Sequence, residues 1–216
     1  MLLDDERDLG VCLVDIGGGT TDMAVFTDGA IKHTSVIPIA GDQITNDIAM
    51  ALRTPTRDAE ELKIAHGVAL RQLASPSDMI EVPGVGERGP RELSRQTLAE
   101  VIEPRVEELY SLIQRELRSA GLEELLSSGI VITGGSALMK GMVELGEEVF
   151  HMPVRVGIPQ YTGALAEVVR NPRYSTGMGL LMAGMEQVKR DRQAKIQGAG
   201  FKEVFDRMKG WFKGNF

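Results

Sequence analysis

The segment 15–22 constrains the fold of this chain more than any other part of the sequence. It reads Asp-Ile-Gly-Gly-Gly-Thr-Thr-Asp and follows an apolar run, 11–14, that predicts a buried strand. Glycines let backbone N–H groups turn towards an anion, and hydroxyls can add hydrogen bonds, so we predict a phosphate-binding loop with Asp15 holding Mg²⁺ through water. The loop consists of Gly17, Gly18, Gly19, Thr20 and Thr21. The alternative is a plain glycine turn in a hairpin, with Asp22 as a cap.

The glycine loop lies within a predicted antiparallel meander of three strands. Residues 9–16, 23–27 and 30–39 have the apolar or alternating patterns of strands, and Asp28-Gly29 predicts a tight turn between the last two. This order differs from a Rossmann unit or a P-loop, in which the glycine loop leads directly into a helix. The polar residues 1–8 predict a frayed start.

The rest of the chain is predicted to contain both helices and strands, so we expect an α/β fold. Helices are predicted at 44–52 with Asp42 as a possible cap, at 58–73, at 96–120 with an interruption or bend near Pro104, at 140–150 and at 174–187. Strands are predicted at 79–83, 129–133 and 154–157, and the Pro-, Gly- and Ser-rich segment 75–94 predicts a small hairpin subdomain.

A second glycine motif follows the predicted strand 129–133 and consists of Gly134, Gly135 and Ser136. A strand that enters a Gly-Gly turn before a helix exposes N–H groups and leaves a flat surface for a purine. Such turns are also common structural joints, but two of them on one sheet can hold opposite ends of a nucleotide. Glu60 and Lys63 share a helix face and predict either contacts with ribose and adenine or an exposed ion pair, which the sequence alone favours.

Composition and charge limit the classes of function. The net charge is −7, with +4 on residues 186–216 and −11 on the rest, and an acidic body argues against nucleic-acid binding. The single Cys12 excludes a disulfide framework and indicates a reducing compartment. No signal peptide or apolar run of membrane-spanning length is visible. His33, His66 and His151 lack metal-ligand spacing, so no metal other than nucleotide-bound Mg²⁺ is expected.

Two groups of residues predict contacts with partners. Four arginines near the hairpin subdomain are candidates for binding an acidic or C-terminal peptide, with a solvated basic face as the alternative: Arg88, Arg91, Arg95 and Arg105. In the tail, seven apolar residues fall within an arc of ~140° of a helix: Phe201, Val204, Phe205, Met208, Trp211, Phe212 and Phe216. Lys202, Lys209, Lys213 and Arg207 border that arc. This pattern is typical of a helix that lies in a membrane interface, although a terminal helix docked on its own body is the alternative.

The two glycine motifs, in this order, resemble those of the actin, Hsp70 and sugar-kinase superfamily. Together with segments 33–38 and 95–105 and the amphipathic tail, they resemble the FtsA family of bacterial actin-like division proteins. The resemblance implies an actin-like ATPase lobe with an RNase H-like mixed sheet, and an ATP site with Mg²⁺. It assigns the first loop to phosphate, and Gly134–Ser136 with Glu60 and Lys63 to adenosine.

Only one of the family's two phosphate loops is found, so the chain resembles the second half alone. The resemblance implies a weak ATPase at most in the intact family, and we expect this half to be inactive and to bind ATP weakly, with a dissociation constant of about 1 mM. The implied divisions are subdomain 2A at 1–56 and 126–186, subdomain 2B at 57–125, a linker at 187–200 and a membrane-targeting helix at 201–216.

The resemblance also implies a function. FtsA anchors filaments of the tubulin-like FtsZ, as a peripheral protein on the cytoplasmic face of the inner membrane at the septum. Its implied partners are the FtsZ C-terminal peptide, anionic lipid, other division proteins and further copies of itself, with no nucleic acid. Arg88 and Arg105 are the first candidates for the peptide site, followed by Arg91 and Arg95. The alternatives are an ATP-dependent enzyme or a pilus-assembly actin homologue of the same superfamily.

Overall fold

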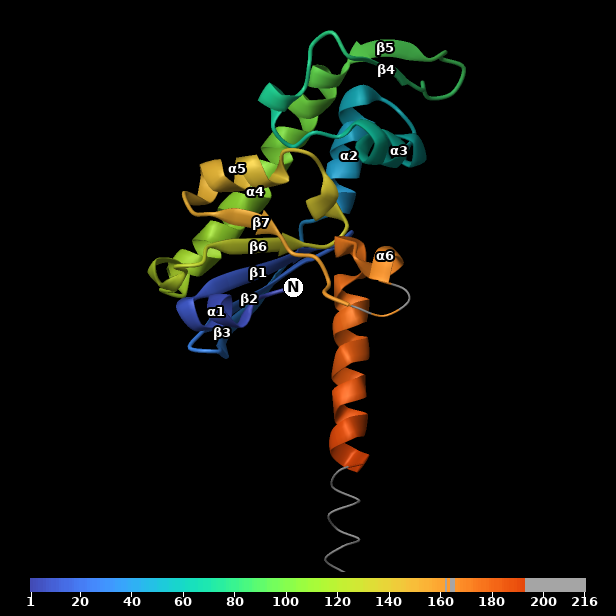
Figure 1. Cartoon of the computed structure of the whole chain (residues 1–216). Coiled ribbons are helices and arrows are strands. Elements are labelled where there is room, and N and C mark those ends of the chain that lie inside the picture. The colour runs from blue at the N-terminus through green and yellow to red at the C-terminus, as the bar shows by residue number, and fades with distance from the viewer. Residues whose placement is uncertain (162, 164–165, 193–216) are drawn as a thin grey trace, which may run out of the picture. The chain divides into compact units, whose positions relative to one another are not determined.

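The computed structural model describes residues 1–161, 163 and 166–192. The chain divides into two units, Met1–Ser175 and Thr176–Phe216. The first unit is built around a five-stranded sheet with the order β3-β2-β1-β6-β7 (Figure 1).

The first three strands form the predicted antiparallel meander. They are β1 (Val11–Ile16), β2 (Thr21–Thr27) and β3 (Ala30–Ile37). Asp28 and Gly29 have φ angles of 51° and 71°, so the predicted turn is formed with both residues in the left-handed region. The strands β6 (Ile130–Thr133) and β7 (Val154–Val156) continue the sheet in the direction parallel to β1. The sheet is therefore mixed, as predicted.

A helix is found in each segment where one is predicted, although several begin or end at other residues than predicted. The helices are α1 (Asp4–Leu9), α2 (Gly41–Leu52), α3 (Thr56–His66), α4 (Arg95–Ser119), α5 (Met142–Phe150) and the short α6 (Ala166–Val169). Four 3-10 turns accompany them: η1 (Arg71–Leu73), η2 (Glu123–Leu125), η3 (Ser136–Leu138) and η4 (Pro172–Tyr174). Residues 175–192 are helical.

The prediction of a frayed start was wrong, because the first residues form α1. Asp4, Asp5 and Glu6 lie in its first turn, where negative charge favours a helix. The guanidinium of Arg155 also binds the carboxylate of Glu6 at 2.6 Å. This ion pair joins α1 to β7, a contact that local sequence does not reveal.

Four other helix predictions also need correction. The helix predicted at 58–73 ends at His66, since a Cβ at Gly67 would lie 2.3 Å from the carbonyl oxygen of Lys63. The helix α4 continues through Pro104, so the predicted interruption is absent. Asp42 does not cap α2, because Ala40 is its N-cap residue. The helix predicted to begin at 140 begins two residues later, after η3.

The predicted hairpin subdomain forms a second sheet of two strands, β4 (Met79–Val82) and β5 (Arg91–Ser94). Figure 1 shows this hairpin beside α2 and α3, at the end of the first unit opposite to β3 and α1. No strand pairing joins it to the larger sheet within the described part of the chain. The hairpin therefore depends on helix contacts for its position.

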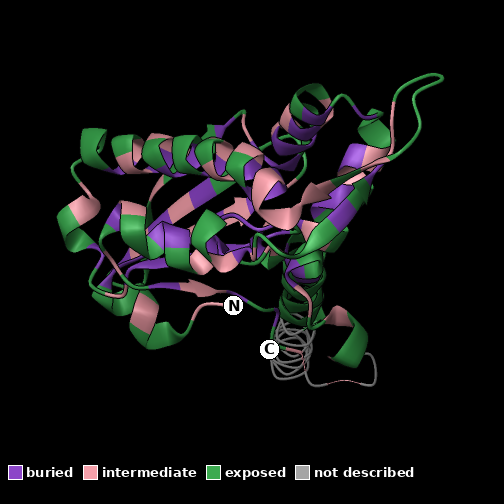
Figure 2. Cartoon of the chain, turned by 90° about the horizontal axis from the view of Figure 1, so that it is seen from above, coloured by how far each residue is buried: buried purple, intermediate pink, exposed green. Residues whose placement is uncertain are grey.

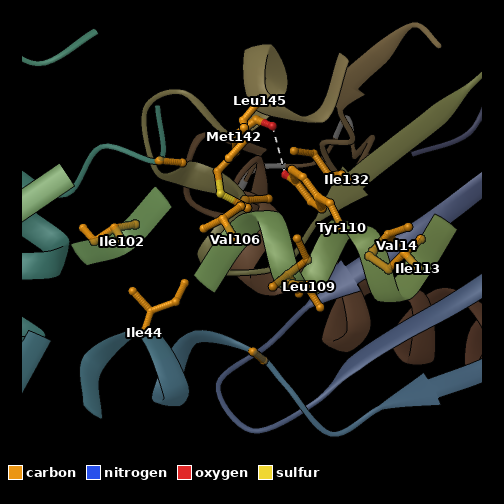
Figure 3. Packing of buried hydrophobic residues seen from close by; sticks show 14 of the residues in the cluster. Val14, Ile44, Ile102, Val106, Leu109, Tyr110, Ile113, Ile132, Met142 and Leu145 are labelled. Atoms are coloured by element: carbon orange, nitrogen blue, oxygen red, sulfur yellow. Dashed lines mark hydrogen bonds between the residues drawn. The ribbon is translucent and has the colours of Figure 1, made fainter. Parts of the chain in front are cut away.

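One face of α4 supplies much of the hydrophobic core, and its opposite face is exposed (Figure 2). Its buried residues are Leu98, Ala99, Ile102, Val106, Leu109, Tyr110, Ile113 and Leu117. Tyr110 donates a hydrogen bond to the carbonyl of Met142 at 2.9 Å, which satisfies its buried hydroxyl (Figure 3). This packing joins α4 to the sheet and to α5, and it fixes the elements that carry the two glycine motifs. In the described residues, no helix has the length and apolar character needed to cross a membrane.

Candidate functional site

The first glycine loop joins β1 to β2 and rests on the N-terminus of α2. The N–H of Gly17 donates to the carbonyl of Thr20 at 3.0 Å, which closes the turn. The carbonyls of Gly17 and Gly18 accept the N–H groups of Gly41 and Asp42 at 3.1 and 2.8 Å. The first two residues of α2 therefore hold the loop at the positive end of the helix dipole.

Two backbone N–H groups of this loop are available for a ligand. Those of Gly18 and Gly19 have no hydrogen-bond partner in the described part of the chain, and both residues are exposed. Free N–H groups on a glycine turn beside a helix N-terminus form a suitable site for an anion. The geometry fits the predicted phosphate loop.

The hydroxyl groups of the loop have other partners. Thr20 donates to the carboxylate of Asp22 at 3.2 Å. Thr21 is fully buried and donates to the carbonyl of Ile39 at 2.7 Å, so its hydroxyl hydrogen anchors β2 and faces no ligand. The backbone N–H groups, rather than these hydroxyls, are the donors that the loop offers.

The second glycine motif lies directly against the first. Gly134 has φ +90°, and a Cβ there would lie 2.4 Å from the carbonyl oxygen of Ile16 and 2.5 Å from Oδ1 of Asp15. The hydroxyl of Ser136 donates to the carbonyl of Gly17 at 3.0 Å. The two motifs therefore belong to one sheet, and they contact each other directly.

Glu60 and Lys63 form the ion pair that the sequence alone favoured, but its lysine is buried rather than exposed. Lys63 is only 8% exposed, and its Nζ lies 2.7 Å from Glu60, 2.9 Å from the carbonyl of Gly41 and 2.8 Å from Thr45 Oγ1. The Thr45 hydroxyl also contacts the Glu60 carboxylate. Partial burial by itself raises the pKa of Glu60, but the hydrogen bonds from Lys63 and Thr45, with the charge of Lys63, outweigh it and lower that pKa. Glu60 is thus held as a carboxylate.

These elements enclose a cavity of about 600 Å³, within the usual size range of ligand pockets. Six of the residues predicted to bind nucleotide line it: Gly17, Gly18, Glu60, Lys63, Gly135 and Ser136. The cavity is also lined by residues from α2, α3, α4 and η4 and from the segment before α5: Gly41, Asp42, Ile64, Ala65, Gly67, Arg95, Leu138, Met139, Lys140 and Arg173. Asp15, Gly19, Thr20, Thr21 and Gly134 are not among the described lining residues.

Sequence reasoning missed the role of Asp42. Its carboxylate faces the glycine loop, because Oδ1 would lie 3.2 Å from a Cβ placed on Gly18. The signal that could have found it is the Gly41-Asp42 pair between a strand and a helix. In the described part of the chain, no three His, Cys, Asp or Glu side chains gather closely enough to hold a metal. A Mg²⁺ ion at this site therefore needs ligand oxygens in addition to Asp15 and Asp42.

The four arginines predicted to bind a peptide have different surroundings. Arg105 binds both oxygens of Asp47, at 2.5 and 3.0 Å, and Glu108 at 2.5 Å. Arg91 donates to the carbonyl of Leu52, and Arg95 donates to that of His66 while it lines the cavity. Arg88 is exposed in the loop between β4 and β5. The structure does not test whether any of them binds a peptide.

The predicted membrane residues lie outside the described part of the chain, and their role stays a prediction. They are Phe201, Lys202, Val204, Phe205, Arg207, Met208, Lys209, Trp211, Phe212, Lys213 and Phe216. The proposed subdomain boundaries also stay predictions.

Comparisons with solved structures show the fold. MreB5 of Spiroplasma citri bound to ADP matches with a TM-score of 0.69 at 21% identity, over 88% of this chain and 57% of that chain. A chain of the PilM–PilN type IV pilus biogenesis complex matches with a TM-score of 0.61 at 18% identity, over 84% of this chain and 47% of that chain. At these identities the likeness establishes the fold alone, which is that of an actin-like ATPase lobe.

Comparisons of sequence show the family. The profile described as "Cell division protein FtsA" matches residues 12–179. The cell division protein FtsA of Pseudomonas aeruginosa is 58% identical over 222 positions, covering 100% of this chain and 53% of that protein. The chain thus spans about half the length of the curated relatives it matches. By the residues matched and the identity reached, this chain belongs to the FtsA family of cell-division proteins.

Proposed function

We propose that the cavity binds the nucleotide ATP, with its phosphates on the glycine loop and its adenosine near Glu60, Lys63 and the second glycine motif. The observation that carries the proposal is the convergence of both glycine motifs and the Glu60–Lys63 pair on one cavity. The N–H groups of Gly18 and Gly19 suit phosphate oxygens, and the Glu60 carboxylate suits the ribose hydroxyls. The MreB5 structure, which contains ADP, supports the same class of ligand.

Mg²⁺ fits the donor set beside the glycine loop. Asp15 and Asp42 are the carboxylates that would hold it, directly or through water, with phosphate oxygens as further ligands. The ion would neutralise phosphate charge that two carboxylates would otherwise repel.

The nucleotide proposal predicts a specific loss in Glu60→Gln. This substitution keeps the shape of the side chain but removes the charge that would accept hydrogen bonds from ribose, so we expect ATP affinity to fall about tenfold. Isothermal calorimetry with Mg-ATP measures the change. The matched control is Glu61→Gln, which removes the same charge from the next residue, outside this cavity. Equal affinity in parent and Glu60→Gln would remove Glu60 from the site, and no ATP binding by the parent would contradict the proposal.

At the level of the cell, we propose that the protein links FtsZ filaments to the membrane at the division septum. Membership of the FtsA family supports a role in division rather than in pilus assembly. In this proposal the hairpin region receives the FtsZ C-terminal peptide, the tail binds anionic lipid on the cytoplasmic face, and the protein associates with further copies and other division proteins.

Arg88 provides the cleanest test of the peptide site. Arg105 is bound to Asp47 and Glu108, so its reversal to Glu would add repulsion within the fold. Arg88 is exposed, and no ion pair to it is found in the described residues. We expect Arg88→Glu to weaken binding of the FtsZ C-terminal peptide about tenfold at low salt, without changing the melting temperature. Fluorescence anisotropy of a labelled peptide measures this.

The control for the peptide test is Arg57→Glu, the same charge reversal on α3. Among the described residues, Glu61 is the one hydrogen-bond and ion-pair partner of this side chain. We expect this variant to bind peptide like the parent. If both reversals weaken binding equally, the attraction is general and Arg88 is not part of a site.

A further inference from the structure

Arg95 lies where the hairpin sheet meets the cavity. It is the first residue of α4 and directly follows β5, and Ser94 caps the helix by accepting the N–H of Thr97 at 3.1 Å. The N–H of Arg95 donates to the carbonyl of Asp78 at 2.7 Å, next to the first residue of β4. The backbone of Arg95 therefore closes the base of the hairpin.

The side chain of Arg95 extends from this base to the cavity wall. Its Nε donates to the carbonyl of His66, the last residue of α3, at 2.9 Å. A guanidinium has five N–H groups, and no carboxylate pairs with this one in the described part of the chain. By contrast, carboxylates on two sides occupy Arg105. Arg95 thus brings unused donors to a cavity that it lines.

The charges of the cavity favour an electron-rich ligand near Arg95. Lys63 is neutralised by Glu60, while Lys140 and Arg173 join Arg95 on the wall without a carboxylate partner among the described residues. Hydrogen bonds show which lining residues are neighbours in the cavity. The hydroxyl of Ser136 donates to the carbonyl of Gly17, and Nζ of Lys63 donates to the carbonyl of Gly41, which lies beside both of them. Gly67 follows the last residue of α3, four residues after Lys63.

Arg95 is hydrogen-bonded to the last residue of α3, whereas Lys63, about one turn earlier, is hydrogen-bonded to Gly41 beside the phosphate loop. We therefore infer that Arg95 lies farther from the phosphate loop than Lys63. If phosphates lie on the glycine loop, the base and ribose extend towards Arg95. A guanidinium can donate to ring nitrogens or stack on the face of a purine.

We propose that Arg95 contacts the base end of the bound nucleotide and thereby links occupancy of the cavity to the order of the hairpin β4–β5. The inference rests on the proposed nucleotide function. A ligand that accepts from Arg95 restrains the residue that ends the hairpin and begins α4. By linkage, the same coupling makes a restrained hairpin favour ligand binding.

Hydrogen–deuterium exchange of the full chain, with and without saturating Mg-ATP, tests the coupling. In the parent we expect ATP to slow amide exchange across residues 79–94. In Arg95→Gln we expect affinity to fall about tenfold by calorimetry, and the hairpin to exchange at its ligand-free rate even at saturation. Arg95→Lys keeps the charge but not the planar fork that can bind His66 and ligand together, so it should retain most of the affinity and lose the protection.

The control is Arg115→Gln, the same substitution at an exposed position of α4, which should match the parent in both measurements. Circular dichroism melting confirms that each variant is folded. If the parent binds ATP and Arg95→Gln binds equally well or keeps the ATP-dependent protection, the role of Arg95 is overturned while the nucleotide site stands. If the parent does not bind ATP, both proposals fail.

Discussion

A single methyl group at Gly134 is expected to destabilise the protein by about 3–5 kcal/mol. The added Cβ would lie 2.4 Å from the carbonyl oxygen of Ile16 and 2.7 Å from its carbonyl carbon, and this is backbone that cannot rotate away. The residue also has φ +90°, which is strained for any side chain. Gly134→Ala should therefore force β1 and β6 apart where the two glycine motifs meet. Urea unfolding followed by circular dichroism measures the loss.

Gly135 supplies a control one residue away. A Cβ there would meet no atom within 4 Å, and the backbone is in the right-handed helical region with φ −63°. We expect Gly135→Ala to change the free energy of unfolding by less than about 1 kcal/mol. Similar losses in the two variants would show that the steric contact at Gly134 is not what requires glycine.

The second large effect is expected in the tail, where Phe205→Glu combined with Trp211→Glu should abolish membrane binding. The two charges fall on the apolar arc of the predicted helix, which must enter the headgroup region for binding. Each basic residue near an anionic surface contributes about 1 kcal/mol, which is too little to hold the helix once the apolar face is lost. Flotation with liposomes that contain anionic lipid measures binding.

The double variant Gly210→Glu and Gly214→Glu adds the same charge on the opposite side of the predicted helix. It should retain most of the binding, because the apolar arc is intact and Glu favours a helix more than Gly does. If the Phe205 and Trp211 variant still floats like the parent, the tail is not the anchor. If the two double variants lose membrane binding equally, net charge rather than the apolar arc governs binding.

The sequence predicted the strands of the sheet and the two glycine turns because each depends on a local pattern. Apolar runs mark the strands, Asp28-Gly29 marks its turn, and strings of glycine mark backbone that must approach something closely. The predicted ends of the strands differ from the observed ends by no more than two residues. Patterns of this kind do not require knowledge of which distant segments touch.

Contacts between distant residues are what the sequence could not predict. Arg105 meets Asp47 across 58 positions, and Arg95 meets His66 across 29, so a grouping of arginines by sequence could not separate their environments. The burial of Lys63 likewise depends on Gly41 and Thr45 of another helix. The helix α1 is fixed by Arg155, which lies 149 residues from Glu6.

The position of β3 at the edge of the sheet has a consequence for how the protein behaves at high concentration. In the described part of the chain β3 pairs with β2 alone, so one row of its backbone groups is free to accept a strand from another molecule. Ile31 and Val36 on this strand are each 60% exposed and would favour such pairing. Lys32 lies between them and carries a charge that resists burial against an identical edge. Lys32 therefore opposes the addition of a second copy of β3 at this edge of the sheet.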